Sequence, residues 1–413
     1  MKLLHISDWH VGLVTGPHAR RSDHEKVLAE LVAAARFYKP DLILHTGDVF
    51  HVAIPAVDDM KFGLESLQEL AALAPVIVLR GNHDSDKLFR VFSLLLGPAS
   101  PLTFVDLPPR LSDNDPIIRR PADDGKTTIA LAALPFIHHN RFVQRYGDAE
   151  TQTVTFADSL GQYERTLGQV LVRGLAPARE VAIFAAHQFV QGAHKSGSER
   201  PIHVGDDYAT RSSDIPAVSY AAFGHIHKPQ MIAGSSHARY AGSPIQIDFG
   251  EEGEEKSCVF VEAKPRSTAR VEVLPLRGGR QLLSVSTTLA ELATHGERCA
   301  GQLCRVTVRT DVPIPDLAEQ VRDTLAKAAI VEVVEDCSAT RISAVEESGE
   351  LSAEQSLGEL FDEFLALNPV PSAEAERVRT AFRKVHSAAE NEEELAFEDF
   401  DVLEAALTGE SVA

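Results

Sequence analysis

The fold is decided by the start of the chain, which reads Lys2-Leu3-Leu4-His5-Ile6-Ser7-Asp8-Trp9-His10. An apolar run typical of a buried strand ends here in a carboxylate and an imidazole. Four later apolar runs end in polar residues in the same way, at Gly47-Asp48, Gly81-Asn82-His83-Asp84, His187 and Gly224-His225-Ile226-His227. Because strand ends meet at one edge of a sheet, these side chains are expected to converge although they lie far apart in sequence.

Strands and helices alternate in the pattern that follows the first strand. Ser22-Asp23-His24-Glu25 has the spacing of a capping box and predicts the start of an amphipathic helix. A second helix is expected around residues 57–74, before the third strand. The resulting β-α-β-α-β order predicts parallel strands joined by right-handed crossovers. Further strands are expected at residues 129–134 and after His237, a helix at 161–173, and strands and turns over 231–276.

A second, smaller domain is predicted after Gly278-Gly279. The pattern there alternates again, with strands at 282–287, 303–309 and 331–334 and helices at 289–299 and 316–328. About sixty residues of this kind form a compact α/β unit. The chain is therefore divided into an α/β domain at 1–277, a small α/β domain at 278–345 and a helical tail at 346–413.

The tail is strongly acidic and amphipathic. Residues 346–413 contain 18 acidic and 4 basic residues, so that they hold most of the net charge of −20. Such a charge repels nucleic acid and suits a basic protein surface or simple solubility. Apolar residues recur at helical spacing on either side of Pro369 and Pro371, at Leu357, Leu360, Phe361, Phe364 and Leu365 and then at Val378, Phe382 and Val385. These two short helices are expected either to pack on their own domain or to occupy a groove of a partner.

Composition excludes several classes of protein. The hydrophobic content of 44% is that of an ordinary globular core, and no apolar run has the length of a membrane-spanning helix. The start of the chain lacks the pattern of a signal peptide. The four cysteines, which show no Cys-x-x-Cys spacing, are expected to be reduced and mostly buried, as in a cytoplasmic protein.

The polar residues at the strand ends indicate a metal site. Carboxylate, amide and imidazole ligands without thiolates suit manganese, iron or zinc. Two divalent ions roughly 3.5–4 Å apart need ligands of this number and type, with a carboxylate bridging them. Asp48 is the candidate bridge, and the remaining candidates are Asp8, His10, Asn82, His187, His225 and His227.

These motifs resemble those of the calcineurin-like metallophosphoesterase superfamily, which are Asp-x-His, Gly-Asp, Gly-Asn-His-Asp/Glu, His and Gly-His-x-His. The flanking residues are similar to a narrower group, the SbcD family, which supplies the nuclease subunit of the bacterial SbcC–SbcD complex. That similarity rests on residues 7–12, 47–51, 224–230 and Tyr240-Ala241-Gly242-Ser243-Pro244-Ile245-Gln246. The motifs cover residues 1 to about 250, whereas the small domain and tail fit only by order and size.

The resemblance implies a β-sandwich flanked by helices and two metal ions, usually manganese. One ion would be held by Asp8, His10, Asp48 and His227, and the other by Asp48, Asn82, His187 and His225. His83 would be the general acid that protonates the leaving sugar oxygen, Asp84 would orient or tune its imidazole, and His51 would lie near the scissile phosphate.

The resemblance also implies a biological setting. The protein would act as a 3′–5′ exonuclease on duplex ends and an endonuclease on hairpins and single strands, in DNA repair, recombination and replication. Its partners would be DNA, an SbcC-type coiled-coil ATPase and a second copy of the chain. The docking candidates for the ATPase are Leu357, Leu360, Phe361, Phe364 and Phe382.

Two other functions remain open. The same metal site could serve a phosphomonoesterase or a cyclic-nucleotide phosphodiesterase, although the Gly-Asp-x-x-Asp-Arg-Gly run of protein phosphatases is absent. A non-catalytic scaffold is disfavoured by the complete ligand set.

Four other features are interpreted as structural or incidental. Gly125-Lys126-Thr127 imitates a phosphate-binding loop but lacks the earlier glycine, because Arg120 stands there. His138-His139 are expected to be loop residues rather than ligands, with contact to DNA backbone left open. Residues 194–200 are expected in a solvated loop, in which Lys195 and Arg200 could contact phosphate, and Trp9 is expected to pack beside the site.

Overall fold

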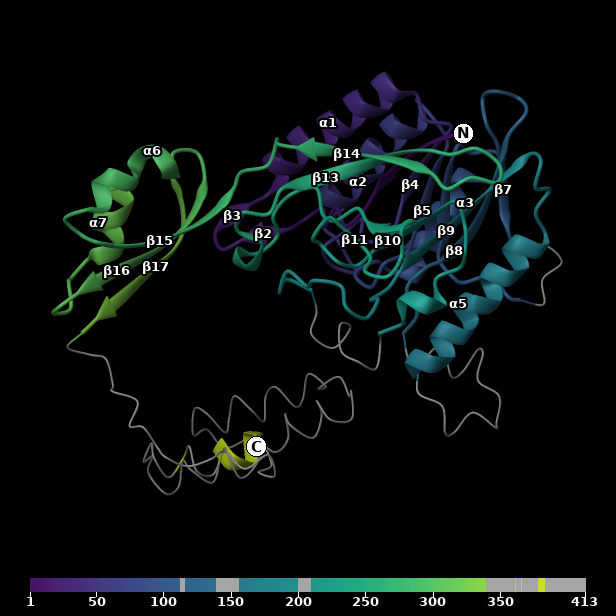
Figure 1. The fold of residues 1–413 in the computed structure, drawn as a ribbon. Coiled ribbons are helices and arrows are strands. Elements are labelled where there is room, and N and C mark those ends of the chain that lie inside the picture. Colours follow the sequence, from purple (N-terminus) through teal and green to yellow (C-terminus); the bar gives the residue numbers. More distant parts are fainter. Residues whose placement is uncertain are drawn as a thin grey trace. The chain divides into compact units, whose positions relative to one another are not determined.

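The first large sheet is built from the alternating strands at the start of the chain and is completed by two strands from residues 256–276 (Figure 1). The computed structural model describes residues 1–111, 116–138, 156–199, 209–338, 361, 365 and 378–382. The strand order is β14 (Arg270–Leu276), β13 (Lys256–Glu262), β1 (Lys2–Ile6), β4 (Leu42–His45), β5 (Val76–Leu79) and β6 (Leu102–Val105). Strands β1, β4 and β5 are parallel, as predicted, and β6, which the sequence pattern did not predict, is parallel to β5. Strand β13 pairs antiparallel with both of its neighbours.

The second large sheet contains the strands that end at His187 and Gly224. Its order is β11 (Gln230–Met231), β12 (Ala238–Tyr240), β10 (Tyr220–Gly224), β9 (Glu180–His187), β8 (Thr128–Leu134) and β7 (Ile118–Pro121). Strands β8, β9, β10 and β12 are parallel, and Gly224 pairs with His187. The ends of β9 and β10 therefore lie side by side.

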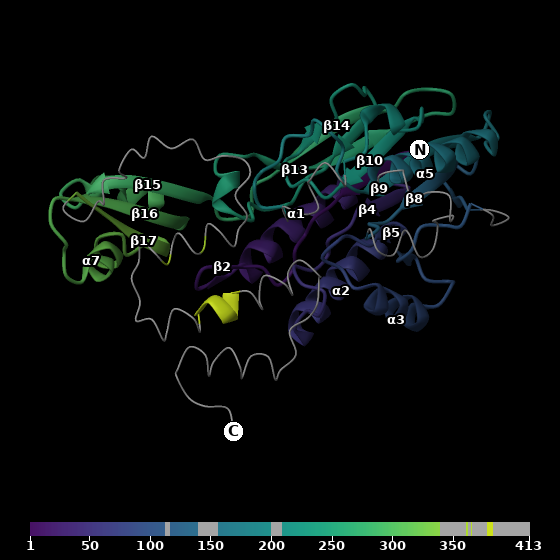
Figure 2. The same cartoon turned by 90° about the horizontal axis from the view of Figure 1, so that it is seen from below.

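The two sheets form a sandwich with helices on both outer faces (Figure 2). Apolar side chains of β1, β4, β5, β8, β9, β10 and β13 form one continuous core between the sheets. Helices α1 (Arg21–Tyr38), α2 (Val57–Ala71) and α3 (Asp86–Leu96) cover the first sheet, and α5 (Phe156–Arg173) covers the second. The predicted β-sandwich flanked by helices is thus confirmed. Opposing strand ends from two sheets can place ligands around one point.

The first helix begins differently from the prediction. Helix α1 starts at Arg21 after Arg20, and no side chain caps its first turn. The predicted capping box at Ser22 is therefore wrong. Asp23 lies in the first turn, where its carboxylate accepts hydrogen bonds from the buried Arg20 and from Arg280. Pairing of a buried guanidinium replaces local capping here.

Residues 278–338 form a separate three-stranded parallel sheet (Figure 1). Its strands are β15 (Leu282–Thr288), β16 (Leu303–Thr310) and β17 (Ala329–Cys337), and α7 (Leu317–Thr324) covers it. The single helix predicted at 289–299 is wrong, because the segment forms η5 (Leu292–His295) followed by the short helix α6 (Gly296–Cys299). Thr294, His295 and Gly296 are weak helix formers, which explains the interruption.

Three short elements connect the larger ones, namely the hairpin β2 (Val14–Thr15) with β3 (His18–Ala19), η3 (Ser212–Asp214) and η4 (Phe249–Glu251). All four cysteines are buried and free. In the part of the chain that the structure describes, no helix is long and apolar enough to cross a membrane.

The chain divides into two compact units, residues 1–341 and 342–413. In the second unit the described residues are helical, and the rings of Phe361 and Phe382 stack with centroids 3.9 Å apart and an angle of 6° between their planes. Leu365 is buried. The two amphipathic segments therefore contact each other through aromatic side chains. The other docking candidates, Leu357, Leu360 and Phe364, lie outside the described residues.

Candidate metal centre

The candidate ligands stand at the ends of five strands and are all buried. Asp8 and His10 follow β1, Asp48 follows β4, Asn82 follows β5, His187 ends β9, and His225 and His227 follow β10. Their side chains are 0–6% exposed. Buried polar side chains in such number require partners, because an unpaired buried charge is costly. The structure therefore brings the seven predicted residues together, as expected from their positions at the strand ends.

The backbone around these ligands is strained. Asp8, His10, Asp48 and His225 have φ angles of 50°, 51°, 55° and 96°, a region that residues with a Cβ atom rarely adopt. Strain of this kind persists where surrounding structure enforces it and is concentrated at functional sites. The sharp turns direct the four side chains back toward one point instead of along the strands.

The first ligand cluster joins the two sheets. His10 Nε2 and His227 Nε2 face each other at 3.1 Å, and His10 Nε2 lies 3.7 Å from Asp48 Oδ2. A carboxylate oxygen of Asp8 and one ring nitrogen each of His10 and His227 all lie within 4.8 Å of one another. Two imidazole nitrogens that converge with carboxylate oxygens have the donor chemistry of a divalent-cation site.

The second cluster shares Asp48 with the first. Asn82 Oδ1 lies 2.9 Å from His187 Nε2 and 2.8 Å from His225 Nδ1. His187 Nε2 lies 3.4 Å from Asp48 Oδ2, the same oxygen that approaches His10. One carboxylate between two groups of oxygen and nitrogen ligands is the arrangement that a pair of bridged ions needs. The residues present therefore fit two metal ions.

Burial and neighbouring charges shift the pKa values of the candidate ligands in different directions. Burial raises the pKa of Asp48, but the neighbouring imidazoles of His187 and His83 outweigh it and hold this pKa well below its usual range. Burial lowers the pKa of His187, whereas the charge of Asp48 raises it to about 9. Burial and the His83 imidazole keep the pKa of His10 well below its ordinary value. The centre thus has an anionic bridge beside a neutral imidazole.

The second ring nitrogens of two ligands are held by hydrogen bonds. His187 Nδ1 donates to Thr46 O over 2.7 Å. His227 Nδ1 lies 2.5 Å from Ser198 Oγ and 3.2 Å from Glu251 Oε1. Contacts of this kind set the tautomer and ring orientation of a metal-ligating histidine and leave the other nitrogen for the ion.

His83 lies against the shared carboxylate. Its main-chain N–H donates to Asp48 Oδ1 over 2.7 Å, and its ring centroid lies 4.7 Å from that of His10. His83 Nδ1 donates to the main-chain oxygen of His51 over 2.6 Å. The ring is thereby oriented beside the ligand clusters, and Nε2 is its second titratable nitrogen.

Comparison with known proteins identifies the family. A family model described as calcineurin-like phosphoesterase matches residues 1–229, more than half of the chain. A second, SbcD_C, described as the type 5 capsule protein repressor C-terminal domain, matches residues 278–368. The SbcD subunit of the SbcCD nuclease from Bacillus subtilis (strain 168) is 31% identical over 68% of this chain and 71% of its own length. The chain belongs to the SbcD family of calcineurin-like phosphoesterases.

Two further relatives carry the same name. The protein from Escherichia coli (strain K12) is 27% identical over 92% of this chain and 97% of its own length. The protein from Rhodobacter capsulatus is 25% identical over 77% of this chain and 82% of its own length. The similarity to SbcD proteins therefore extends beyond the metal motifs.

Asp84 in this SbcD-family site is held by main-chain groups of two loops, and its predicted role of orienting or tuning His83 stays a prediction. Its carboxylate accepts hydrogen bonds from the main-chain N–H groups of Gly81, Phe50 and Val49, at 2.9, 3.1 and 3.3 Å. Burial, followed by the charge of Asp48, raises the pKa of Asp84 to about 7. The His83 ring donates its hydrogen bond to the main-chain oxygen of His51, and Asp84 joins the loops that carry Asp48 and Asn82.

The prediction of a solvated loop after residue 193 is wrong for Ser196 and Glu199, which are 7% and 6% exposed. Glu199 accepts hydrogen bonds from the main-chain N–H groups of Ser196, Gly197 and His227. Lys195 lies 4.8 Å above the Phe189 ring, and Arg200 lies outside the described residues. The loop therefore packs against a predicted ligand.

Sequence reasoning missed the residues behind His227, which are Ser198, Glu199, Glu251 and Lys256. Glu251 and Lys256 are 0% and 4% exposed and form an ion pair of 2.6 Å. The run of charges at 251–256 has the appearance of a solvated surface, and only the strand pattern that begins at Lys256 signals burial.

The remaining sequence interpretations concern residues around the site. Trp9 is fully buried against His45, with ring centroids 4.8 Å apart, so its predicted packing role is confirmed. Asp124 accepts hydrogen bonds from the N–H groups of Lys126 and Thr127, which makes Gly125 part of a hairpin turn. His138 is half-buried with its ring 5.0 Å from that of Phe136, and His139 lies outside the described residues.

Proposed function

We propose that this chain is a metal-dependent DNA nuclease subunit that acts with an SbcC-type ATPase. The observation that carries the proposal is the convergence of six buried oxygen and nitrogen side chains around Asp48, with His83 alongside. The nearly full-length similarity to a protein named as the SbcD subunit of the SbcCD nuclease supports the substrate and the partner. The chain would hydrolyse DNA as a 3′–5′ exonuclease and a hairpin or single-strand endonuclease, in repair, recombination and replication.

The two clusters support the ligand sets that the family resemblance implies. Asp8, His10, Asp48 and His227 would hold one ion, and Asp48, Asn82, His187 and His225 the other. Two divalent cations, for which we propose Mn²⁺, neutralise phosphodiester charge and increase the acidity of water at the site. The buried, hydrogen-bonded surroundings hold the ligands in place without reorganisation.

His83 would supply the proton for the leaving group. Its Nδ1 is held by the carbonyl oxygen of His51, so that a protonated Nε2 can donate to the leaving sugar oxygen. The His51 ring lies with its centroid 5.7 Å from that of His83, close enough for both imidazoles to approach one phosphate. Asp84 would act through the main chain of the two loops rather than on the substrate.

The family assignment also suggests how the protein assembles. We infer a homodimer formed through α3, because Val91, Leu94 and Leu95 are 47%, 81% and 77% exposed on this helix. Apolar side chains exposed together are typical of interaction surfaces. We further propose the division into residues 1–277, 278–345 and 346–413, with the third region docking to the ATPase. Phe361 and Phe382 would contribute their stacked rings to that docking. The buried free cysteines fit a cytoplasmic location.

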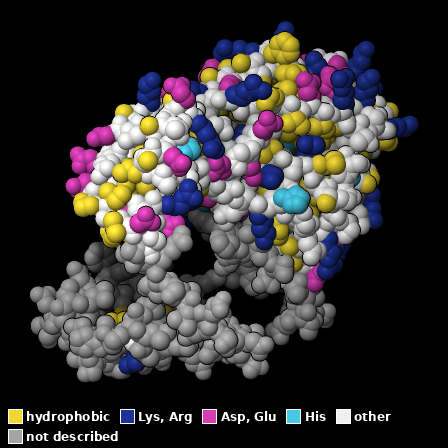
Figure 3. Space-filling view, turned by 60° about the vertical axis from the view of Figure 1, so that its left-hand side comes forward, with side chains coloured by type: hydrophobic (Ala, Val, Ile, Leu, Met, Phe, Trp, Pro, Cys, Tyr) yellow, Lys and Arg dark blue, Asp and Glu magenta, His cyan; other side chains and the backbone are white. Residues whose placement is uncertain are grey.

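The surface shown in Figure 3 does not itself select a substrate. Lys and Arg are interspersed with Asp, Glu and hydrophobic side chains on that face and form no uniform basic band among the described residues. Metal ions would therefore supply much of the local positive charge that meets a phosphate.

One assay separates the nuclease from the alternative, a hydrolase of small phosphomonoesters or cyclic nucleotides. Wild-type chain and His83→Gln are incubated with Mn²⁺ and with linear duplex, hairpin DNA, a chromogenic phosphomonoester or a cyclic nucleotide, with and without the ATPase. We expect Mn²⁺-dependent DNA cleavage that the variant loses while it still binds Mn²⁺. If the chain turns over the small substrates but leaves DNA intact both with and without the ATPase, the nuclease proposal is rejected.

A further inference from the structure

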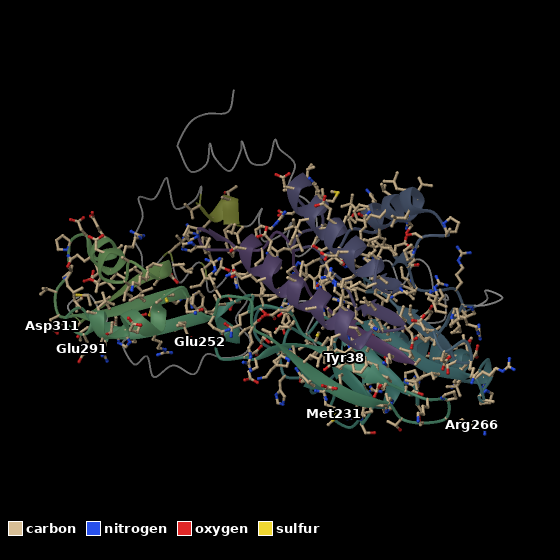
Figure 4. All side chains as sticks on the ribbon, turned by 90° about the horizontal axis from the view of Figure 1, so that it is seen from above. Tyr38, Met231, Glu252, Arg266, Glu291 and Asp311 are labelled. Atoms are coloured by element: carbon tan, nitrogen blue, oxygen red, sulfur yellow. The ribbon has the colours of Figure 1, made fainter. Side chains whose placement is uncertain are left out.

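The segment at residues 246–256 contacts both a candidate metal ligand and the small domain. It includes η4 and lies between β12 and β13. Within it, Glu251 faces His227, whereas Phe249 and Glu252 face the sheet formed by β15 and β16. Figure 4 labels Glu252 where the core and this small sheet meet. One short turn thus contacts both His227 and the small sheet.

On the metal side, Glu251 is enclosed by partners. Its Oε1 lies 3.2 Å from His227 Nδ1 and also accepts a hydrogen bond from Ser198 Oγ. Its Oε2 accepts hydrogen bonds from Ile247 N at 3.0 Å and from Lys256 Nζ at 2.6 Å. Lys256 Nζ in turn donates to His227 O over 3.0 Å. Both the ring and the main chain of His227 are therefore held by the Glu251–Lys256 pair.

On the other side, contacts with the small domain hold the turn. The Arg305 guanidinium of β16 lies 4.2 Å above the Phe249 ring. Glu252 Oε2 accepts a hydrogen bond from Ser284 N over 2.9 Å, and Glu252 Oε1 lies 3.7 Å from Arg298 Nη2. The Gln246 side chain accepts a hydrogen bond from Leu282 N over 2.7 Å. These contacts fix both ends of the turn against one edge of the small sheet.

We propose that Glu251 is a positioning residue for His227, and that the small domain keeps Glu251 in place through Phe249 and Glu252. Loss of the small-domain contacts lets the turn shift, so that the His227 ring loses its fixed orientation and one of the two metal sites weakens. The other site, formed around Asn82, has no ligand held by this turn among the described residues. Movement of the small domain would thereby alter metal binding at a single site.

This inference depends on the proposed function only in that both require metal ions at the site. Mn²⁺ binding is therefore measured without DNA, by calorimetric titration of the full chain after removal of metal. A chain that binds two ions but leaves DNA intact would reject the nuclease and leave this inference standing. The variants are Glu251→Gln, which removes the charge but keeps the size, and Arg305→Ala, which removes the contact with Phe249.

Two variants serve as matched controls. Glu255→Gln changes an exposed carboxylate in the same segment. Glu332→Ala removes the 2.8 Å partner of Arg305 but leaves the guanidinium above Phe249. Both controls should bind two Mn²⁺ ions with wild-type affinity. If Glu251→Gln fails to fold, as judged by circular dichroism without metal, Ser198→Ala replaces it, because Ser198 also contacts His227 Nδ1.

In Glu251→Gln we expect one site to lose roughly 10- to 100-fold in affinity while the other is unchanged. In Arg305→Ala the same site should lose roughly three- to tenfold, as befits one cation–π contact. At saturating Mn²⁺ the cleavage rate should recover, whereas a general structural defect would lower it at every concentration. Two wild-type sites in Glu251→Gln would overturn the positioning role, and Arg305→Ala indistinguishable from Glu332→Ala would overturn the link to the small domain.

Discussion

Replacing Gly81 by alanine should disable the metal centre without unfolding the protein. An added Cβ atom would lie 2.1 Å from Asp48 Oδ1 and 2.4 Å from Asp48 N, whereas real Cβ contacts stay above 3.0 Å. Asp48 or the Gly81 loop must therefore move by about 0.9 Å. Rotation of the carboxylate offers no escape, because Oδ1 accepts the His83 N–H and Oδ2 lies 3.4 Å from His187 Nε2.

The expected size of the effect follows from that displacement. Misplacing a catalytic group by about 1 Å can cost on the order of 100-fold in rate, and overpacking a dense site costs about 1–3 kcal/mol of stability. Gly296→Ala is the matched control, since its φ is −54° and its Cβ would meet nothing within 4 Å. Mn²⁺-dependent cleavage of a duplex is measured for both variants, alongside thermal unfolding without metal. Equal cleavage by the two variants would show that the site accepts the added methyl group without displacing Asp48.

Three further predictions concern protonation and assembly. The charge of Asp48 raises the pKa of His187 to about 9 against the effect of burial, so this imidazole must release a proton when it binds a metal. Mn²⁺ affinity should therefore rise with pH up to about 9, and calorimetry in buffers of different ionisation enthalpy should detect the released proton. Burial raises the pKa of Glu164 from 4.5 to about 8, so its contribution to stability is full below about pH 4.5 and is lost as the pH rises through about 8. Glu164→Gln should remove this pH-dependent loss of stability, which is on the order of a few kcal/mol. The prediction is contradicted if urea unfolding shows the same change in stability between pH 5 and pH 8 in the wild type and the variant. Leu94 and Leu95 are 81% and 77% exposed, and replacing both by Glu should prevent dimer formation. Light scattering should show monomers at a concentration where the wild type is dimeric, with Mn²⁺ binding unchanged. A dimeric variant would exclude α3 as the interface.

The ligands could be predicted because each follows an apolar strand directly. Asp8, Asp48 and Asn82 stand after β1, β4 and β5, and parallel strands bring their ends to one edge. The same rule placed His187 beside His225, since β9 pairs with β10. Local pattern and sheet geometry sufficed there, because each residue's position depends on the strand that it follows.

Contacts between distant segments could not be predicted from the local pattern. The orientation of His83 depends on a main-chain oxygen of His51, which the identity of residue 51 does not reveal. The start of α1 depends on Asp23 pairing with Arg280, 257 residues away. Glu251 lies in a run of charges that is indistinguishable from a solvated surface until β13 and the 194–199 loop enclose it. Each case needs the tertiary fold before the partner is known.

We propose that seven residues hold two ions that share Asp48. The most direct test is an anomalous difference map from a crystal of the chain soaked in Mn²⁺, recorded at the manganese absorption edge. We expect two peaks on either side of the Asp48 carboxylate, one near Asp8, His10 and His227 and the other near Asn82, His187 and His225. A single peak, or peaks that leave Asp48 without a metal contact, would contradict it.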